Sequence, residues 1–182
     1  FPGWRFTLAL EPILLTQMGE MSDGYVLAPA DGQTEEVAPS DERAQRAAAA
    51  LTALKTLSAS DGTDVATAPY AGASTVALAA PGWDDGIEQV RLGKQTLQRT
   101  LGLDTLISGG FSPDVDLSTQ SVAAFSRASL DHFLVDDIVS QDLSEAPAEG
   151  AVTARVHDGE GERITLVFVD GGLSRALGIS PD

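Results

Sequence analysis

Short, mostly apolar segments that alternate with helical stretches constrain the fold of this sequence more than any other feature. They occupy residues 5–10, 65–68, 105–108 and 132–135. A strand that is apolar along its length must be buried on both faces, as in the parallel sheet of β-α-β units. The sequence therefore predicts an α/β fold in which these four strands are parallel neighbours.

The stretches between the strands carry helical signals. Ser40 is a suitable N-cap for an alanine-rich helix, and Gly102 is suited to end a later one. Residues 23–40 have many Gly, Pro and acidic residues with weak periodicity, so they are predicted to form a long loop. The predicted helices cover residues 13–18, 40–58 and 84–101, and a stretch that begins at Asp116 or Ser118.

The pattern changes after residue 140. Residues 141–150 are acidic and contain proline, which predicts a loop, and residues 152–156 and 164–169 flank a glycine-containing turn that is typical of a β-hairpin. A short helix is expected at residues 173–177. Because a complete eight-unit barrel needs roughly 250 residues, we expect residues 1–140 to form a partial or incomplete β/α barrel, with or without its first unit. Residues 151–182 are expected to pack on the same domain as a hairpin and short helix.

Composition narrows the classes of partner. The formal net charge is -16 and the pI is near 4.2, so the surface is expected to repel nucleic acid and anionic lipid headgroups. The chain has no cysteine and no run of about 18 apolar residues. These features exclude thiol chemistry and predict no direct membrane insertion. Since the sequence opens at Phe1 with neither initiator Met nor signal peptide, we interpret it as a processed chain or an excised segment.

Three sets of short motifs carry a resemblance to a known superfamily. Their order resembles the middle of family 57 glycoside hydrolases and of polysaccharide deacetylase-type barrels, and the final Asp-x-x-Leu-Ser also resembles a family of actinobacterial exported, membrane-anchored proteins. The resemblance implies a β/α barrel, a carbohydrate-related role and a location outside the cell or in the envelope, anchored by a segment outside this sequence. The motifs are Pro69-Tyr70, then Gly82-Trp83-Asp84-Asp85 with Gln89 and Gly93, then Gly110-Phe111-Ser112-Pro113-Asp114, with Asp170 to Ser174 near the end.

The motifs depart from the catalytic pattern of that superfamily. Phe111 stands where the hydrolases have Trp, and Asp114 stands where they have Glu. No histidine follows the Pro69-Tyr70 turn, and the segment with the glutamate nucleophile has no counterpart. The resemblance therefore implies descent from carbohydrate-active hydrolases, but the catalytic residues of those enzymes cannot be assigned to residues of this sequence.

Ligands of parallel β/α folds bind at the carboxyl ends of the strands, so polar residues just after the predicted strands are the candidate site. Glu11, Asp114 and Asp136 are candidate catalytic carboxylates, which would need a separation of about 5–5.5 Å for a retaining mechanism or 6.5–9.5 Å for an inverting one. Tyr70, Phe111 and Asp137 are candidate ligand contacts. The alternative is that the acids cap helices and the aromatic side chains pack in the core.

No cofactor or metal is expected. The only histidines are His132 and His157, which lie far apart in the predicted fold and do not have the spacing of a shared metal site. We therefore predict a non-catalytic, envelope-associated module that binds a carbohydrate such as a cell-wall glycan, or an envelope protein. The alternatives are an active glycan hydrolase or deacetylase with catalytic residues outside this segment, and a structural interaction domain without a ligand.

Overall fold

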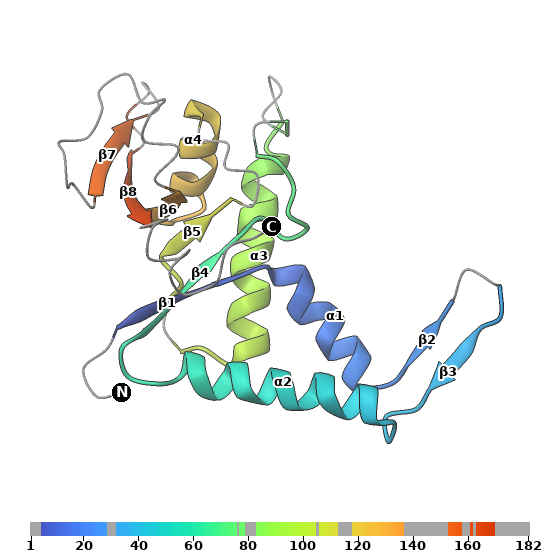
Figure 1. Cartoon of the computed structure of the whole chain (residues 1–182). Helices are drawn as coiled ribbons and strands as arrows, with labels where there is room; N and C mark the ends of the chain where they lie inside the picture. The colour runs from blue at the N-terminus through green and yellow to red at the C-terminus, as the bar shows by residue number, and fades with distance from the viewer. Residues whose placement is uncertain are drawn as a thin grey trace.

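The computed structural model describes residues 5–28, 32–75, 77–78, 83–104, 106–112, 118–136, 153–157, 161 and 163–169. Within these ranges the chain is a mixed α/β structure, as predicted (Figure 1). The strands are β1 (Phe6–Leu10), β2 (Tyr25–Leu27), β3 (Glu35–Val37), β4 (Thr63–Thr67), β5 (Gly109–Phe111), β6 (His132–Asp136), β7 (Thr153–His157) and β8 (Arg163–Val169). The helices are α1 (Pro12–Ser22), α2 (Glu42–Ser58), α3 (Asp85–Leu101) and α4 (Thr119–Arg127).

One six-stranded sheet organises the described chain, in the order β1-β4-β5-β6-β8-β7. The neighbours from β1 to β8 pair in parallel, and β7 joins the edge antiparallel to β8. This confirms the predicted parallel arrangement and the C-terminal hairpin. The second strand of that hairpin pairs directly with β6, so the hairpin lies in the same sheet.

All four helices contribute to one core on a single face of the sheet, which we call the covered face. The largest fully buried side chains there include Leu15 of α1, Leu97 of α3, Phe125 of α4 and Leu166 of β8. Phe125 packs edge to face against Phe133 of β6, with ring centroids 4.5 Å apart. Since apolar burial is the main stabilising contribution in folding, this layer holds the strands in place.

Two glycines allow the helices to approach the covered face closely. A Cβ on Gly110 would lie 2.6 Å from Phe125 Cδ1 and 2.9 Å from Leu130 Cδ1. A Cβ on Gly93 of α3 would collide with the carbonyl oxygen of Ala68 at the end of β4. The motif residues Gly93 and Gly110 therefore have a packing role in this structure.

The opposite face of the sheet has a different character, and we call it the open face. Its residues alternate with those of the covered face along each strand. In contrast with the covered face, most of its side chains are exposed or half-buried. The open face includes Thr7 and Ala9 of β1, Asp64 and Ala66 of β4, Gly109 and Phe111 of β5, His132 and Leu134 of β6, Arg163, Thr165 and Val167 of β8, and Thr153, Arg155 and His157 of β7; of these, Ala66 and Gly109 are buried.

The third parallel strand lies later in the chain than predicted. The apolar residues 106–108 suggested a strand ending at Ser108, whereas β5 consists of Gly109, Gly110 and Phe111. Leu106 is 79% exposed and Ile107 is buried in the core, and both precede the residues that pair with β4 and β6. The prediction failed because it followed hydrophobic residues, whereas β5 begins with two glycines. Glycine is needed at position 110 because Phe125 of α4 packs directly against the strand there.

Residues 23–40 contain an antiparallel ribbon, which corrects the predicted long loop. β2 and β3 pair over three residues each, and the ribbon projects away from the helices in Figure 1. Arg43 of α2 anchors it, because its Nη2 lies 2.6 Å from Glu35 Oε1 and 3.0 Å from Asp41 Oδ2. These hydrogen bonds from Arg43 lower the pKa of Glu35, and they lower the pKa of Asp41 to about 2.

At three helix ends the structure corrects the predicted residue or decides between two predicted residues. Asp41, and not Ser40, caps α2 by accepting a hydrogen bond from the Arg43 amide. Ser118 caps α4 by accepting from the Ser121 amide, which decides between the two predicted caps. α1 extends to Ser22. The helix expected at residues 173–177 lies outside the described residues, and no described helix combines the length and apolarity that crossing a bilayer requires.

Candidate functional site at the carboxyl edge of the sheet

The carboxyl ends of β1, β4, β5, β6 and β8 lie along one edge of the sheet, because these strands are parallel neighbours. Glu11, Tyr70, Phe111 and Asp136 all lie at or just after these ends. Asp136 is the last residue of β6 and is level with Val169 of β8. Asp114 and Asp137 lie outside the described residues, so the two catalytic or binding roles predicted for them stay predictions.

Glu11 presents an exposed carboxylate at this edge. It occupies the N-cap position of α1, but its side chain makes no capping hydrogen bond. Pro12 follows at the first helical position, where its missing amide costs nothing. The carboxylate of Glu11 is therefore not used by the helix and faces solvent.

Tyr70 is tied to two helices. Its backbone amide donates to the Gln89 carbonyl at 3.0 Å, and its carbonyl accepts from the Ile13 amide at 3.1 Å. Its hydroxyl lies 3.4 Å from Thr16 Oγ1 of α1. Tyr70 thus connects the end of β4 to α1 and, through Gln89, to α3. This residue has a structural function that does not depend on contact with a ligand.

Phe111 begins an apolar row on the open face near the carboxyl edge. It is level with Leu134 of β6, which is level in turn with Val167 of β8. All three side chains are half-buried. Because they stand on adjacent strands and the same face, they form a shallow apolar platform one row in from the ends of the strands.

A polar row follows, further toward the amino ends of the strands. His132 lies over Gly109, where a Cβ would be 2.5 Å from its Nε2. Its Nδ1 is 2.6 Å from Asp131 Oδ1 and its Nε2 is 3.5 Å from Asp64 Oδ2. The imidazole therefore links β4 to β6 across the short strand β5.

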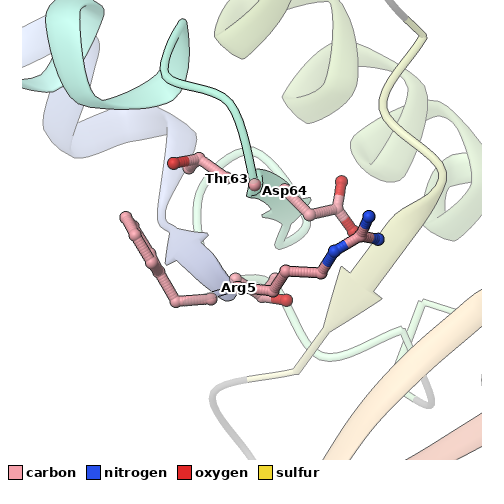
Figure 2. Close-up of a pocket in the computed structure, with 6 residues that line it drawn as sticks. Arg5, Thr63 and Asp64 are labelled. Atoms are coloured by element: carbon pink, nitrogen blue, oxygen red, sulfur yellow. The ribbon is translucent and has the colours of Figure 1, made fainter. Parts of the chain in front are cut away.

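Two hollows open at the amino half of the sheet, away from the predicted site. One has a volume of about 440 Å³ and is lined by residues 5–7 and 62–64. In Figure 2 the Arg5 side chain extends in the direction of the Asp64 carboxylate. The other has a volume of about 260 Å³ and is lined by Leu130, Asp131, Arg155, Arg163, Ile164 and Thr165.

No described cluster has the composition of a metal site. Within the ranges that the structure describes, no three His, Asp or Glu side chains are placed to hold a metal ion together. His132 begins β6 and His157 ends β7, and between their strands lies β8. The described residues thus offer carboxylates, guanidinium groups, hydroxyls and apolar side chains as ligand contacts.

Sequence reasoning missed the grouping of charges on the open face. Alternation within the segment 153–157 signalled that Arg155 and His157 share one face of a strand. It did not signal that Arg155 is level with Thr165, or that Thr165 is level with His132. Such neighbours depend on strand order and register, which no local pattern encodes.

Comparison with known proteins supports the fold. No protein-family model and no curated protein sequence matches this chain. Several solved structures are similar to it. They include the 4-α-glucanotransferase of Thermococcus litoralis, with a TM-score of 0.65 and 18% identity over 100% of this chain, and the α-amylase AmyC of Thermotoga maritima, with a TM-score of 0.58 and 12% identity over 94% of it.

The chain spans 24% of the glucanotransferase and 37% of the amylase. At these identities the likeness concerns the fold alone. The described architecture, a mostly parallel sheet with helices on one face and an antiparallel strand at its edge, is that of a partial β/α barrel. At the level of the fold, this chain therefore resembles part of each of these two enzymes.

Proposed function

We propose that this chain is a glycan-binding segment of a β/α barrel derived from carbohydrate-active enzymes, and that it binds an α-linked glucan at the carboxyl edge of its sheet without cleaving it. The observation that carries the proposal is the platform of Phe111, Leu134 and Val167. The exposed carboxylate of Glu11 lies at the same edge of the sheet, two strands from Phe111. Both fold neighbours are enzymes whose names refer to α-glucans or their hydrolysis.

The platform has the chemistry that a sugar ring needs. An aromatic ring next to aliphatic side chains suits the apolar face of a pyranose, and a carboxylate at the same edge of the sheet can accept hydrogen bonds from hydroxyl groups. Parallel β/α folds bind ligands at this edge of the sheet. Tyr70 carries less of the proposal, because its hydroxyl faces Thr16 of α1.

The absence of cleavage is proposed from the sequence motifs. Hydrolysis needs two carboxyl groups at a defined separation, and Asp114 is one methylene shorter than the Glu of the resembling motif. A misplacement of about 1 Å is enough to cost about 10²-fold in rate. A binding role tolerates that retraction better than catalysis does.

Calorimetric titration with maltoheptaose tests the binding. The Phe111→Ala variant is expected to bind about tenfold more weakly, because an aromatic contact contributes about 1.5 kcal/mol. Phe6→Ala is the matched control, since Phe6 is 43% exposed at the amino end of β1. Equal affinity of both variants, or no binding by the unmodified chain, contradicts the proposal.

A second assay separates binding from turnover. The purified chain is incubated with α- and β-linked glucans, chitooligosaccharides and peptidoglycan fragments, and released reducing ends and acetate are followed. No release is expected. Turnover that disappears in Asp114→Ala would show that the chain is a hydrolase or deacetylase.

An active enzyme is the second candidate, and one observation favours it. Because the chain spans only 24% of the glucanotransferase, a catalytic set can be completed by residues outside these 182. Turnover by the full-length protein, together with none by this segment, would select this candidate. A structural domain without a ligand would bind none of the glycans.

The proposed location is the cell envelope or the exterior, with an envelope protein or glycan as the partner. This part rests on the sequence resemblance. Protease added to intact host cells should degrade the full-length protein there, whereas a cytoplasmic marker protein should survive. Protection of both proteins would place this one inside the cell.

A further inference from the structure

The smaller hollow, at the amino end of β8, is lined by two guanidinium groups that form no ion pair with any described residue. Arg155 of β7 and Arg163 of β8 both line it and both are exposed. Arg155 is level with Thr165, and Arg163 precedes Thr165 by two residues on the same face. The described residues provide no ion pair or hydrogen bond for either arginine side chain.

Several other basic side chains of the described structure have partners. Arg43, Arg46 and Arg91 each lie within 3.0 Å of a carboxylate oxygen. Lys94 donates to the carbonyl oxygens of Ala128 and Ser129 at the end of α4. Arg155 and Arg163 differ from the other arginines without a described counter-ion, such as Arg99, because they line the same hollow.

The one acidic side chain in the hollow is already engaged. Asp131 Oδ1 lies 2.6 Å from Nδ1 of His132, and the other imidazole nitrogen faces Asp64. His132 thus draws the Asp131 carboxylate toward β6. Asp131 forms no ion pair with Arg155 or Arg163.

We infer that this hollow binds the carboxylate group of an acidic sugar, such as a uronic acid, through Arg155 and Arg163. Guanidinium groups present planar donors that match a carboxylate. Leu130 and Ile164, whose side chains belong to the core, also line the hollow, and its volume of about 260 Å³ suits one small charged unit.

The lining favours a sugar over an acidic peptide. Thr165 supplies a hydroxyl, and Asp131 supplies a carboxylate oxygen that accepts hydrogen bonds from sugar hydroxyls. A peptide chain with several carboxylates would meet repulsion from Asp131 and from the negative surface of the protein. The choice of a sugar rests on the proposed glycan-binding role, whereas the carboxylate site rests on the arginines alone.

The test compares D-glucuronate, D-glucose and N-acetyl-L-glutamate in NMR titrations of the ¹⁵N-labelled chain. Glucuronate is expected to saturate and to shift the amide signals of Arg155, Arg163 and Thr165, whereas glucose is expected to leave them unchanged. Equal responses to glucuronate and glucose, or no response to glucuronate, would overturn the inference. N-acetyl-L-glutamate binding as tightly as glucuronate would overturn the assignment to a sugar.

Two variants test the residues separately. Arg155→Ala and Arg163→Ala are each expected to weaken glucuronate binding about tenfold, the usual loss for a hydrogen bond to a charged group. Both side chains are exposed, so the fold should survive, which circular dichroism checks. Arg99→Ala, which removes an exposed arginine of α3, is the control and should bind normally. Unchanged affinity in both arginine variants would contradict the site.

The test also separates this hollow from the carboxyl edge. Phe111→Ala is expected to leave glucuronate binding unchanged, and Arg155→Ala is expected to leave maltoheptaose binding unchanged. If the unmodified chain binds only one of the two ligands, the result therefore identifies which of the two proposals fails.

Discussion

The two faces of the sheet differ in what holds them together. The covered face contacts four helices through buried apolar side chains such as Phe125, Leu166 and Val90, each with no exposed surface. The open face has half-buried Leu134 and Val167 beside Asp64, His132 and exposed arginines. Parallel sheets normally have both faces covered, so the difference indicates that the covered face provides most of the burial that stabilises the described fold.

The neighbouring glycines 109 and 110 show the same contrast within two residues. Gly110 faces the rings and methyl groups of Phe125 and Leu130, which other core residues fix in place. Gly109 faces the imidazole of His132, whose side chain is 20% exposed and has room to move. The need for glycine therefore has a different strength on each face.

Truncation of one large side chain on each face should produce the largest difference. Phe125→Ala is expected to lower the free energy of unfolding by about 3–5 kcal/mol, because it leaves a cavity in the core. Leu134→Ala on the open face is expected to cost about 1 kcal/mol, since its side chain is only half-buried. Urea denaturation measures both, and equal losses would show that the open face is part of the core.

Substitution of the paired glycines should give a smaller difference. Gly110→Ala is expected to destabilise the fold by about 1–3 kcal/mol through overpacking against Phe125. Gly109→Ala is expected to cost less than about 1 kcal/mol, because His132 can turn away from the added methyl group. Thermal unfolding of the two variants compares them directly, and a larger loss for Gly109→Ala would reverse the assignment of the faces.

The polar row of the open face should contribute little to stability. A double-mutant cycle between Asp64→Asn and His132→Asn is expected to give a coupling below about 1 kcal/mol, because Asp64 is 54% exposed and the pair is 3.5 Å apart. Faster hydrogen exchange at the β5 amides would reveal the lost link across that strand. A coupling of several kcal/mol would mean that this row, like the core, determines the fold.

The ion pairs of Arg43 with Glu35 and Asp41 should contribute least to the free energy of unfolding, because all three side chains are at the surface. The pKa of Asp41 is lowered to about 2 by hydrogen bonds from the Arg43 side chain and backbone amide. Ionised Asp41 therefore favours the folded state above its ordinary pKa of 3.8, and this contribution is lost as the pH falls toward 2.

The difference in urea midpoint between the unmodified chain and Asp41→Asn should accordingly be full at pH 6 and absent near pH 2. Asn retains the capping oxygen, so the comparison isolates the charge. Asp61→Asn, which removes an exposed carboxylate in the turn before β4, is the control. A difference that persists unchanged at pH 2 would rule out the charge as its cause.

Sequence periodicity was sufficient for the parts of the fold that depend on local burial. It predicted β1, β4, β6 and the C-terminal hairpin, and it predicted α3 from the apolar spacing that ends at Gly102, which has a φ of 70°. It failed at β5, where two glycines carry no hydrophobic signal. It also missed the ribbon formed by β2 and β3, whose strands have only three residues each.

The sequence by itself determined the α/β class, the parallel direction of the strands and the candidate residues at their carboxyl ends, because these follow from which side chains avoid water. Only the tertiary structure decided that Phe111 stands level with Leu134 and Val167, and that Arg155 and Arg163 share one hollow. These neighbours come from strands up to 56 residues apart, from Phe111 to Val167. Strand order and register, set by the packing of four helices on one face, bring them together.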